Sequence, residues 1–189
     1  GMPVWQKLLA SLFQSVTTRT AGFFTVSQAG LTEAGKAVSD MLMFVGGSSG
    51  STAGGLKTVT LGVVVLAAVG TARGRSRASV FRHTIPQEKV SQAMTLFMLM
   101  LTLAFVGAAL ICACSGCSLS TALYETVSAL ATVGLTAGLT ATLTTLPKLL
   151  LIVFMFFGRV GIMTISIGFL TASRAEDRFE YAPARMLIG

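Results

Sequence analysis

Residues 119–135 read LSTALYETVSALATVGL, a short apolar segment that ends in the turn Thr132-Val133-Gly134-Leu135. The apolar part, 119–131, is too short to cross a bilayer, whose hydrocarbon core of about 30 Å needs about 20 helical residues. A short helix that enters the membrane must leave it through non-helical backbone, which survives at that depth only where it is buried in protein or lines water. This stretch therefore predicts a re-entrant helix and loop inside an all-α membrane protein.

A second copy of this pattern lies near the start of the chain. The apolar segment from Pro3 to Thr17 precedes the turn Thr20-Ala21-Gly22-Phe23. When the sequence is aligned with itself so that Thr20 falls on Thr132, ten positions between Thr20 and Thr52 are identical, including the threonine and glycine of each turn. Common residue frequencies would give only about two or three such matches. This repeat alignment defines a unit of short helix, T-x-G turn, polar linker and spanning helix.

The composition places this unit in a membrane. Of 189 residues, 53% are apolar and 11% charged, whereas soluble domains average about 25% charged. This balance excludes a disordered chain and argues against a water-soluble globule. Val90 to Cys114 is long enough to span without a charge, Leu149 to Ser173 spans with one, and Ser39 to Ala72 spans with an interruption.

The positive charges predict the topology. The net charge is +7, and eight of the fourteen basic residues fall in two short stretches, Arg73 to Lys89 and Arg174 to Arg185. Basic loops next to spanning helices are cytoplasmic under the positive-inside rule, so both T-x-G turns should open to the outside. The same placement argues against nucleic acid as a partner. The C-x-C-x-x-C cluster of Cys112, Cys114 and Cys117 could bind a soft metal or could simply supply small residues at a helix end.

The two T-x-G turns have the composition of a cation filter. A desolvated cation needs several oxygens at close range, and backbone carbonyls in a narrow loop can supply them. Glycine permits the unusual dihedral angles that aim successive carbonyls at one axis, and threonine adds a hydroxyl oxygen. The short helix before each turn would point the negative end of its dipole at the ion. The predicted potassium-binding residues are Thr20, Ala21, Gly22, Phe23, Thr132, Val133, Gly134 and Leu135.

The interrupted spanning segment predicts a gate. Five glycines in ten residues disfavour a helix, and a polar, flexible segment below the filter could block a pore and move aside. The predicted gate residues are Gly46, Gly47, Ser48, Ser49, Gly50, Ser51, Thr52, Ala53, Gly54 and Gly55, with Arg159. The five donors of Arg159 could hold carbonyls of this segment as a latch, or the arginine could pair with Asp40 or Glu125. A phosphate-binding loop is disfavoured because an extra residue displaces Lys57 and both flanks are apolar helices.

These motifs together resemble the Trk/Ktr/HKT superfamily of potassium transporters. Residues 15–23 look like the third pore loop of that family, residues 46–58 like the glycine-rich break in the following helix, and residues 125–135 like the fourth pore loop. Residues 157–161 resemble the last spanning helix and 185–189 the C-terminus of the family. The resemblance covers nearly the whole chain in the right order. The break differs from the family pattern at Ser49 and Ala53, where proline and glycine would be expected.

The resemblance implies a fragment of a four-repeat, channel-like transporter. Residues 1–73 would be the third repeat without its first helix, 74–89 a cytoplasmic basic loop, 90–173 the fourth repeat and 174–189 a cytoplasmic tail. It implies potassium or sodium uptake without covalent chemistry or a cofactor, by a homodimer in the bacterial inner membrane, gated by a cytosolic nucleotide-binding regulatory subunit. Lipid would be a further partner of the basic loop. The alternatives are a solute-coupled secondary transporter with a binding site at the broken helix, and a fragment that does not conduct.

Overall fold

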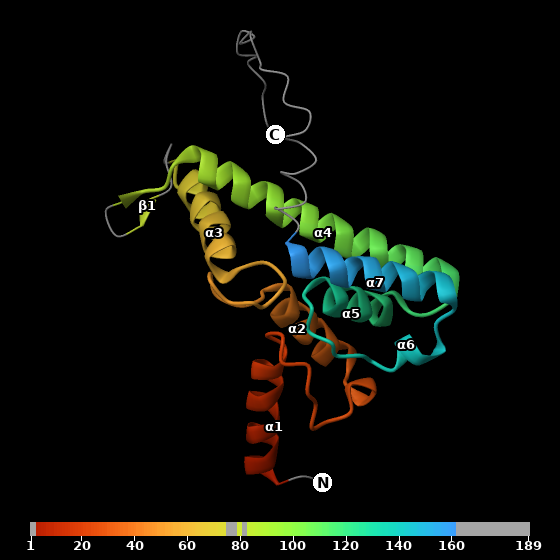
Figure 1. The fold of residues 1–189 in the computed structure, drawn as a ribbon. Helices are drawn as coiled ribbons and strands as arrows, with labels where there is room; N and C mark the ends of the chain where they lie inside the picture. Colours follow the sequence, from red (N-terminus) through yellow and green to blue (C-terminus); the bar gives the residue numbers. More distant parts are fainter. Residues whose placement is uncertain (1–2, 75–78, 81–82, 162–189) are drawn as a thin grey trace.

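The computed structural model describes residues 3–74, 79–80 and 83–161, most of them helical (Figure 1). The elements in chain order are α1 (Val4–Thr17), η1 (Gln28–Gly30), α2 (Glu33–Phe44), α3 (Thr58–Ala72), β1 (Ser79–Val80), β2 (His83–Thr84), α4 (Gln87–Ser115), α5 (Leu119–Leu130), α6 (Leu139–Thr142) and α7 (Thr145–Val160).

The helices agree closely with the segments expected from the sequence. Helix α4 has 29 residues and is long and apolar enough to cross a membrane, and α3 is a shorter apolar helix of 15 residues. Helix α7 begins at Thr145, before the expected Leu149. The rest of that expected span, 162–173, and the tail, 174–189, lie outside the described residues.

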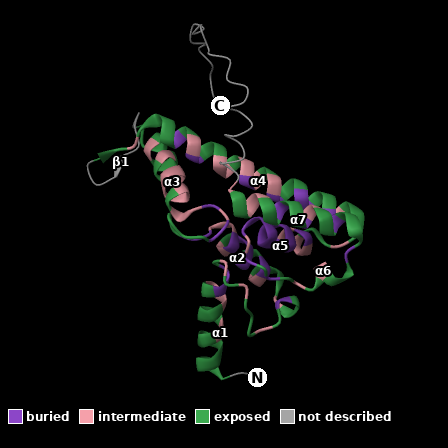
Figure 2. Cartoon of the chain, in the orientation of Figure 1, coloured by how far each residue is buried: buried purple, intermediate pink, exposed green. Residues whose placement is uncertain are grey.

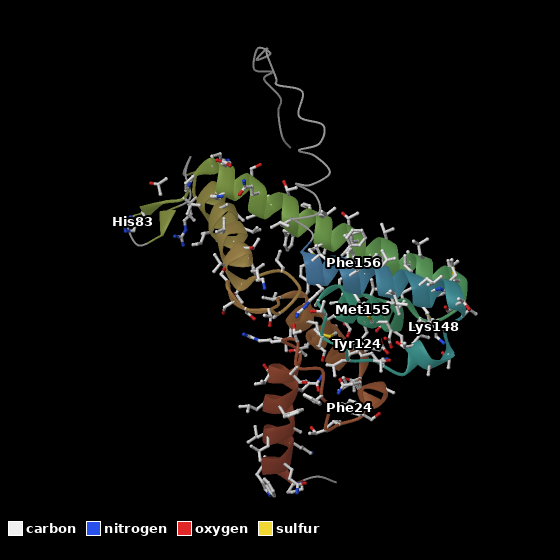
Figure 3. All side chains as sticks on the ribbon, viewed as in Figure 1. Phe24, His83, Tyr124, Lys148, Met155 and Phe156 are labelled. Carbon is white, nitrogen blue, oxygen red and sulfur yellow. The ribbon has the colours of Figure 1, made fainter. Side chains whose placement is uncertain are left out.

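The basic loop differs from the all-helical expectation. Strands β1 and β2 form a short antiparallel hairpin in which Val80 pairs with His83. His83 lies on this hairpin at the end of the molecule remote from α5 and α7 (Figure 3). Strands of two residues leave almost no periodic pattern in a sequence, because the alternation of a strand needs four or more residues to be visible.

The internal repeat is also present in the helices. In the repeat alignment, which pairs Thr20 with Thr132, α2 and α7 begin at equivalent positions, Glu33 and Thr145, and each follows a threonine at its N-cap. The Thr32 hydroxyl accepts a hydrogen bond from the backbone N–H of Gly35 at 3.1 Å, which satisfies one of the free donors at the helix start. The linkers that precede these helices also match, because η1 and α6 occupy corresponding places.

Helix α5 forms the centre of the fold. It packs against α2, α4 and α7, and every residue from Tyr124 to Leu130 is buried (Figure 2). Helix α1, the equivalent helix of the first repeat, packs chiefly against α2 and exposes most of its apolar side chains. The second repeat therefore places its turn in a packed core, whereas the first places its turn at an edge of the described chain.

Two glycines bring the spanning helices close to α5. A Cβ atom at Gly107 in α4 would collide with the ring of Phe154 and would lie 2.8 Å from the methyl group of Thr126. A Cβ atom at Gly158 in α7 would collide with the carbonyl oxygen of Leu130 at the end of α5. Small residues allow this close approach of membrane helices. Gly107 and Gly158 therefore fix the position of α5 and of the turn that follows it.

Candidate functional site

The two T-x-G turns share an unusual backbone conformation. Thr20 and Thr132 have φ angles of +68° and +54°, and they are the non-glycine residues with positive φ among those the structure describes. Gly22 and Gly134, two positions later, have φ angles of +76° and +87°. A β-branched residue with positive φ is a genuine outlier, and such strain persists mainly at functional sites. Both turns thus hold the same strained conformation at equivalent positions.

This alternation of φ favours a common direction for the carbonyl groups of each turn. Left-handed and right-handed residues in alternation gather successive N–H groups on one side of the backbone, and the carbonyls consequently gather on the other. In each turn a residue with negative φ, Ala21 or Val133, separates two residues with positive φ. A row of carbonyl oxygens on one side is the arrangement that a dehydrated cation requires.

The two turns lie against each other although they are far apart in the sequence. The Thr20 hydroxyl donates a hydrogen bond to the carbonyl oxygen of Ala131 at 3.3 Å. A Cβ atom at Gly22 would collide with the carbonyl oxygen of Val133 and would lie 3.9 Å from the Cα atom of Gly134. The structure therefore brings the predicted filter residues of both repeats together, with the Val133 carbonyl directed towards the first turn.

The last residue of each turn is tied back to its own helix. The Thr17 hydroxyl donates to the carbonyl of Phe23 at 2.5 Å, and the Ser128 hydroxyl donates to the carbonyl of Leu135 at 2.6 Å. The carbonyls of Phe23 and Leu135 are thus engaged by buried hydroxyl groups. The carbonyls that precede them in each turn are more available to an ion.

Helix α5 anchors the linkers of both repeats. The Tyr124 hydroxyl donates to Gln28 Oε1 at 2.9 Å, and the Thr140 hydroxyl donates to Glu125 Oε2 at 2.7 Å. Gln28 and Thr140 are equivalent in the repeat alignment. Two adjacent residues of one helix therefore hold the same point of each linker, and Figure 3 shows Tyr124 at this central position. Sequence reasoning missed Gln28, although the repeat alignment could have paired it with Thr140.

Glu125 should be important for stability. It is 4% exposed and also accepts hydrogen bonds from the Thr136 hydroxyl at 2.5 Å and the Ala137 N–H at 3.0 Å. Glu125→Ala would leave these donors without an acceptor, at a cost of roughly 2 kcal/mol. We expect a lower apparent melting temperature of the purified full-length protein. Glu88→Ala is the control, because that carboxylate is exposed and so is its hydrogen bond with Gln92; an equal drop in both variants would contradict this role.

The glycine-rich segment folds back on α2 and reaches the second turn. The Gly46 N–H donates to the carbonyl of Leu56 at 2.8 Å, and the Leu56 N–H donates to the carbonyl of Phe44 at 3.0 Å. The Gly54 N–H donates to Thr132 Oγ1 at 3.2 Å. The segment between the two halves of the broken helix is therefore an ordered loop in contact with the turn.

Two cationic side chains hold three consecutive carbonyls of this loop. Arg159 Nη1 donates to the carbonyl oxygen of Thr52 at 3.0 Å. Lys57 Nζ donates to the carbonyl of Ser51 at 2.8 Å and also to that of Ala53. Helix α7 places Arg159 there because Gly158 permits its close approach to the end of α5.

In the part of the chain that the structure describes, Arg159 does not pair with Asp40 or Glu125. Glu125 is engaged by the loop after the second turn, and Oδ1 of the buried Asp40 has no hydrogen-bond partner among the described residues. The carbonyl of Thr52 accepts from the arginine instead. Of the two positions that depart from the expected pattern, Ser49 is exposed and Ala53 is buried.

The cysteine cluster lies at the junction of α4 and α5. The Cys112 thiol donates to the carbonyl of Cys117 at 2.8 Å, and burial raises the pKa of the Cys117 thiol. Within residues 3–74, 79–80 and 83–161, no group of three or more potential metal ligands comes together. The bond from Cys112 to Cys117 stabilises the turn between α4 and α5.

The sequence is similar to known cation transport proteins. Residues 2–180 match the family TrkH, described as cation transport protein. The chain is 39% identical to the potassium/sodium uptake protein NtpJ of Enterococcus hirae over 189 residues, which are 97% of this chain and 42% of that protein. It is 35% identical to the Ktr system potassium uptake protein B of Bacillus subtilis, over 92% of this chain and 39% of that protein.

A solved structure shows the same architecture. The potassium transporter TrkH of Vibrio parahaemolyticus matches with a TM-score of 0.74 and 25% identity, over 88% of this chain and 38% of that one. The chain thus spans about two fifths of the length of these relatives.

Proposed function

Because this chain belongs to the TrkH family of cation transport proteins, we propose that it supplies two of the pore loops through which a multi-pass membrane protein takes up potassium. The observation that carries the proposal is the matched pair of strained turns, with positive φ at Thr20 and Gly22 and at Thr132 and Gly134. The carbonyls of these turns replace the hydration shell of the ion, and no covalent chemistry is involved.

The contact between the turns supports a common ion path. The Thr20 hydroxyl bonds to Ala131, and the Val133 carbonyl faces Gly22, so the two rows of oxygens are neighbours. Helices α1 and α5 both end at these turns. Each therefore directs the partial negative charge of its C-terminus at the same region, which favours a cation.

The glycine-rich loop is the gate in this proposal, and Arg159 is its latch. The loop lies against Thr132 in the second turn, and the guanidinium of Arg159 holds its carbonyl at Thr52. A hydrogen bond from a charged donor contributes about 1.5–3 kcal/mol, which suffices to bias a two-state loop towards one position. Lys57, which donates to the two flanking carbonyls, stabilises the same position of the loop.

The proposals for the oligomeric state and the regulation of the full-length protein are drawn from the resemblance to the family. We propose that the full-length protein is a homodimer in the bacterial plasma membrane and that a cytosolic nucleotide-binding subunit controls the gate. Residues 74–89 follow α3, whose helix begins directly after the gate loop. A subunit or anionic lipid that binds this basic stretch could therefore shift the gate loop by moving α3.

Complementation tests this function. The full-length protein should restore growth of a potassium-uptake-deficient bacterium at low external potassium, and rubidium uptake should rise in the same cells. A vector without the gene and a well-expressed variant that lacks residues 130–136 are the controls. Growth no better than that of the deletion variant would contradict the proposal.

Sodium is the second candidate ion. The Enterococcus hirae relative carries the name potassium/sodium uptake protein, and only two of the proposed four loops lie in this chain. Rubidium uptake in the presence of excess sodium distinguishes the two ions. If the pore is selective for potassium, the excess of sodium should leave rubidium uptake nearly unchanged. By contrast, the relatives named above are cation uptake proteins, which gives no support to an organic solute as the substrate.

A further inference from the structure

Thr132 lies between the second turn and the gate loop and contacts both. Its backbone adopts the strained conformation of the turn, and its hydroxyl oxygen accepts a hydrogen bond from the Gly54 N–H at 3.2 Å. The approach is so close that a Cβ atom at Gly54 would collide with Thr132 Oγ1 and lie 2.6 Å from the carbonyl oxygen of Ala131. Gly54 therefore lies in direct contact with the second turn, and the loop is called seated when this contact is made.

The equivalent threonine of the first repeat has a different partner. The Thr20 hydroxyl donates to the carbonyl of Ala131 and so links the two turns to each other. Both threonines share the positive φ angle and the place in the turn. They differ in that the Thr132 hydroxyl is bound to the gate loop.

The Gly54 N–H makes the Thr132 hydroxyl oxygen a weaker ligand for a cation. A hydroxyl oxygen has two lone pairs, and either a cation or an N–H donor can use each of them. The donated N–H also presents the positive end of a peptide dipole to the site where the cation would bind. A cation that uses this oxygen is therefore bound more weakly while the loop is seated, and more tightly when the loop leaves.

We propose that Thr132 couples the gate to the filter, so that seating the loop on Thr132 closes the pore and lowers the cation affinity of the filter together. This inference rests on the proposed function. Because such coupling is reciprocal, a cation bound at the turn must disfavour the seated loop to the same extent. Thr132 is then a residue that positions the gate as well as a ligand of the ion.

Thr132→Val tests the coupling, because valine keeps the shape of threonine and removes the hydroxyl. Rubidium flux is measured in proteoliposomes with the full-length transporter in its resting state. Each Thr132 variant is also made in a background without residues 48–54, which removes Gly54 and its contact with Thr132. Thr95→Val is the matched control, because the Thr95 hydroxyl bonds only to the carbonyl of Ser91 within α4, and Thr132→Ser keeps the hydroxyl.

The coupling predicts a resting flux about fivefold above wild type for Thr132→Val, the factor that corresponds to one net hydrogen bond. The rise should vanish in the loop-deleted background, be absent in Thr95→Val, and be smaller in Thr132→Ser than in Thr132→Val. Gly54→Ala should also raise the resting flux, since its Cβ displaces the loop, whereas Gly62→Ala, with no atom within 4 Å of the added Cβ, should not.

The outcomes separate this inference from the function on which it rests. Absence of cation flux from wild type and loop-deleted protein alike would overturn the proposed function. Normal wild-type flux with an unchanged resting level in both Thr132→Val and Gly54→Ala would overturn the coupling alone. A rise in Thr132→Val that persists without the loop, or an equal rise in Thr95→Val, would also overturn it, because the effect would then not depend on the bond between Thr132 and the loop.

Discussion

Gly22→Ala should abolish potassium uptake while the protein still reaches the membrane. The added methyl group would collide with the carbonyl oxygen of Val133, and the backbone at Gly22 has a φ angle of +76°. A side chain in that conformation costs about 1–2 kcal/mol even without a collision. The turn must therefore change its shape and move the Val133 carbonyl, so the oxygens no longer match a dehydrated ion. We expect at least a hundredfold lower rubidium uptake, because misplaced ligands leave the cost of dehydration uncompensated.

Gly30→Ala is the matched control for this substitution. Gly30 lies in η1 of the same repeat, and an added Cβ atom there would meet no atom within 4 Å. It should transport normally. Normal uptake by Gly22→Ala at equal expression would contradict the placement of this turn on the ion path, and equal loss in both variants would point to folding instead.

Arg159→Gln should raise the resting flux about tenfold or more. The substitution leaves the carbonyl of Thr52 without its charged donor, and a charge-assisted hydrogen bond contributes about 1.5–3 kcal/mol. The closed state loses that stabilisation, whereas the open state, in which the loop has left the arginine, loses nothing. Arg159→Lys should be intermediate, since lysine keeps the charge but has a different reach and geometry.

Lys148→Gln controls for the loss of a positive charge from α7. Lys148 is exposed on the same helix, near its opposite end (Figure 3). Its flux and its response to activation should equal those of wild type. The latch would be wrong if Arg159→Gln left resting flux and regulation unchanged, or if Lys148→Gln raised the flux as much.

The repeat and the helices could be predicted from the sequence because they depend on local and periodic features. The short apolar segment before Thr132 ends where α5 ends, and the repeat alignment places the starts of α2 and α7 correctly. The hairpin at Val80 and His83 could not be predicted, since two-residue strands depend on a turn and not on a pattern.

The contacts of the candidate site could not be predicted from the sequence. The sequence indicates that Gly22 and Gly134 need special dihedral angles, yet nothing in it indicates that Thr20 and Thr132 also adopt positive φ, which threonine rarely does. The bond between Gly54 and Thr132 joins residues 78 positions apart. Such a contact depends on the packing of α7 and α5, which only the folded chain defines.

The central claim is that the carbonyl oxygens of these two turns bind the transported ion. Anomalous diffraction from crystals of the full-length protein grown with thallium, a heavy substitute for potassium, tests it most directly. Anomalous peaks should lie within direct coordination distance of the carbonyl oxygens at 20–22 and 132–134. Peaks elsewhere in the membrane region, with none between these turns, would contradict it.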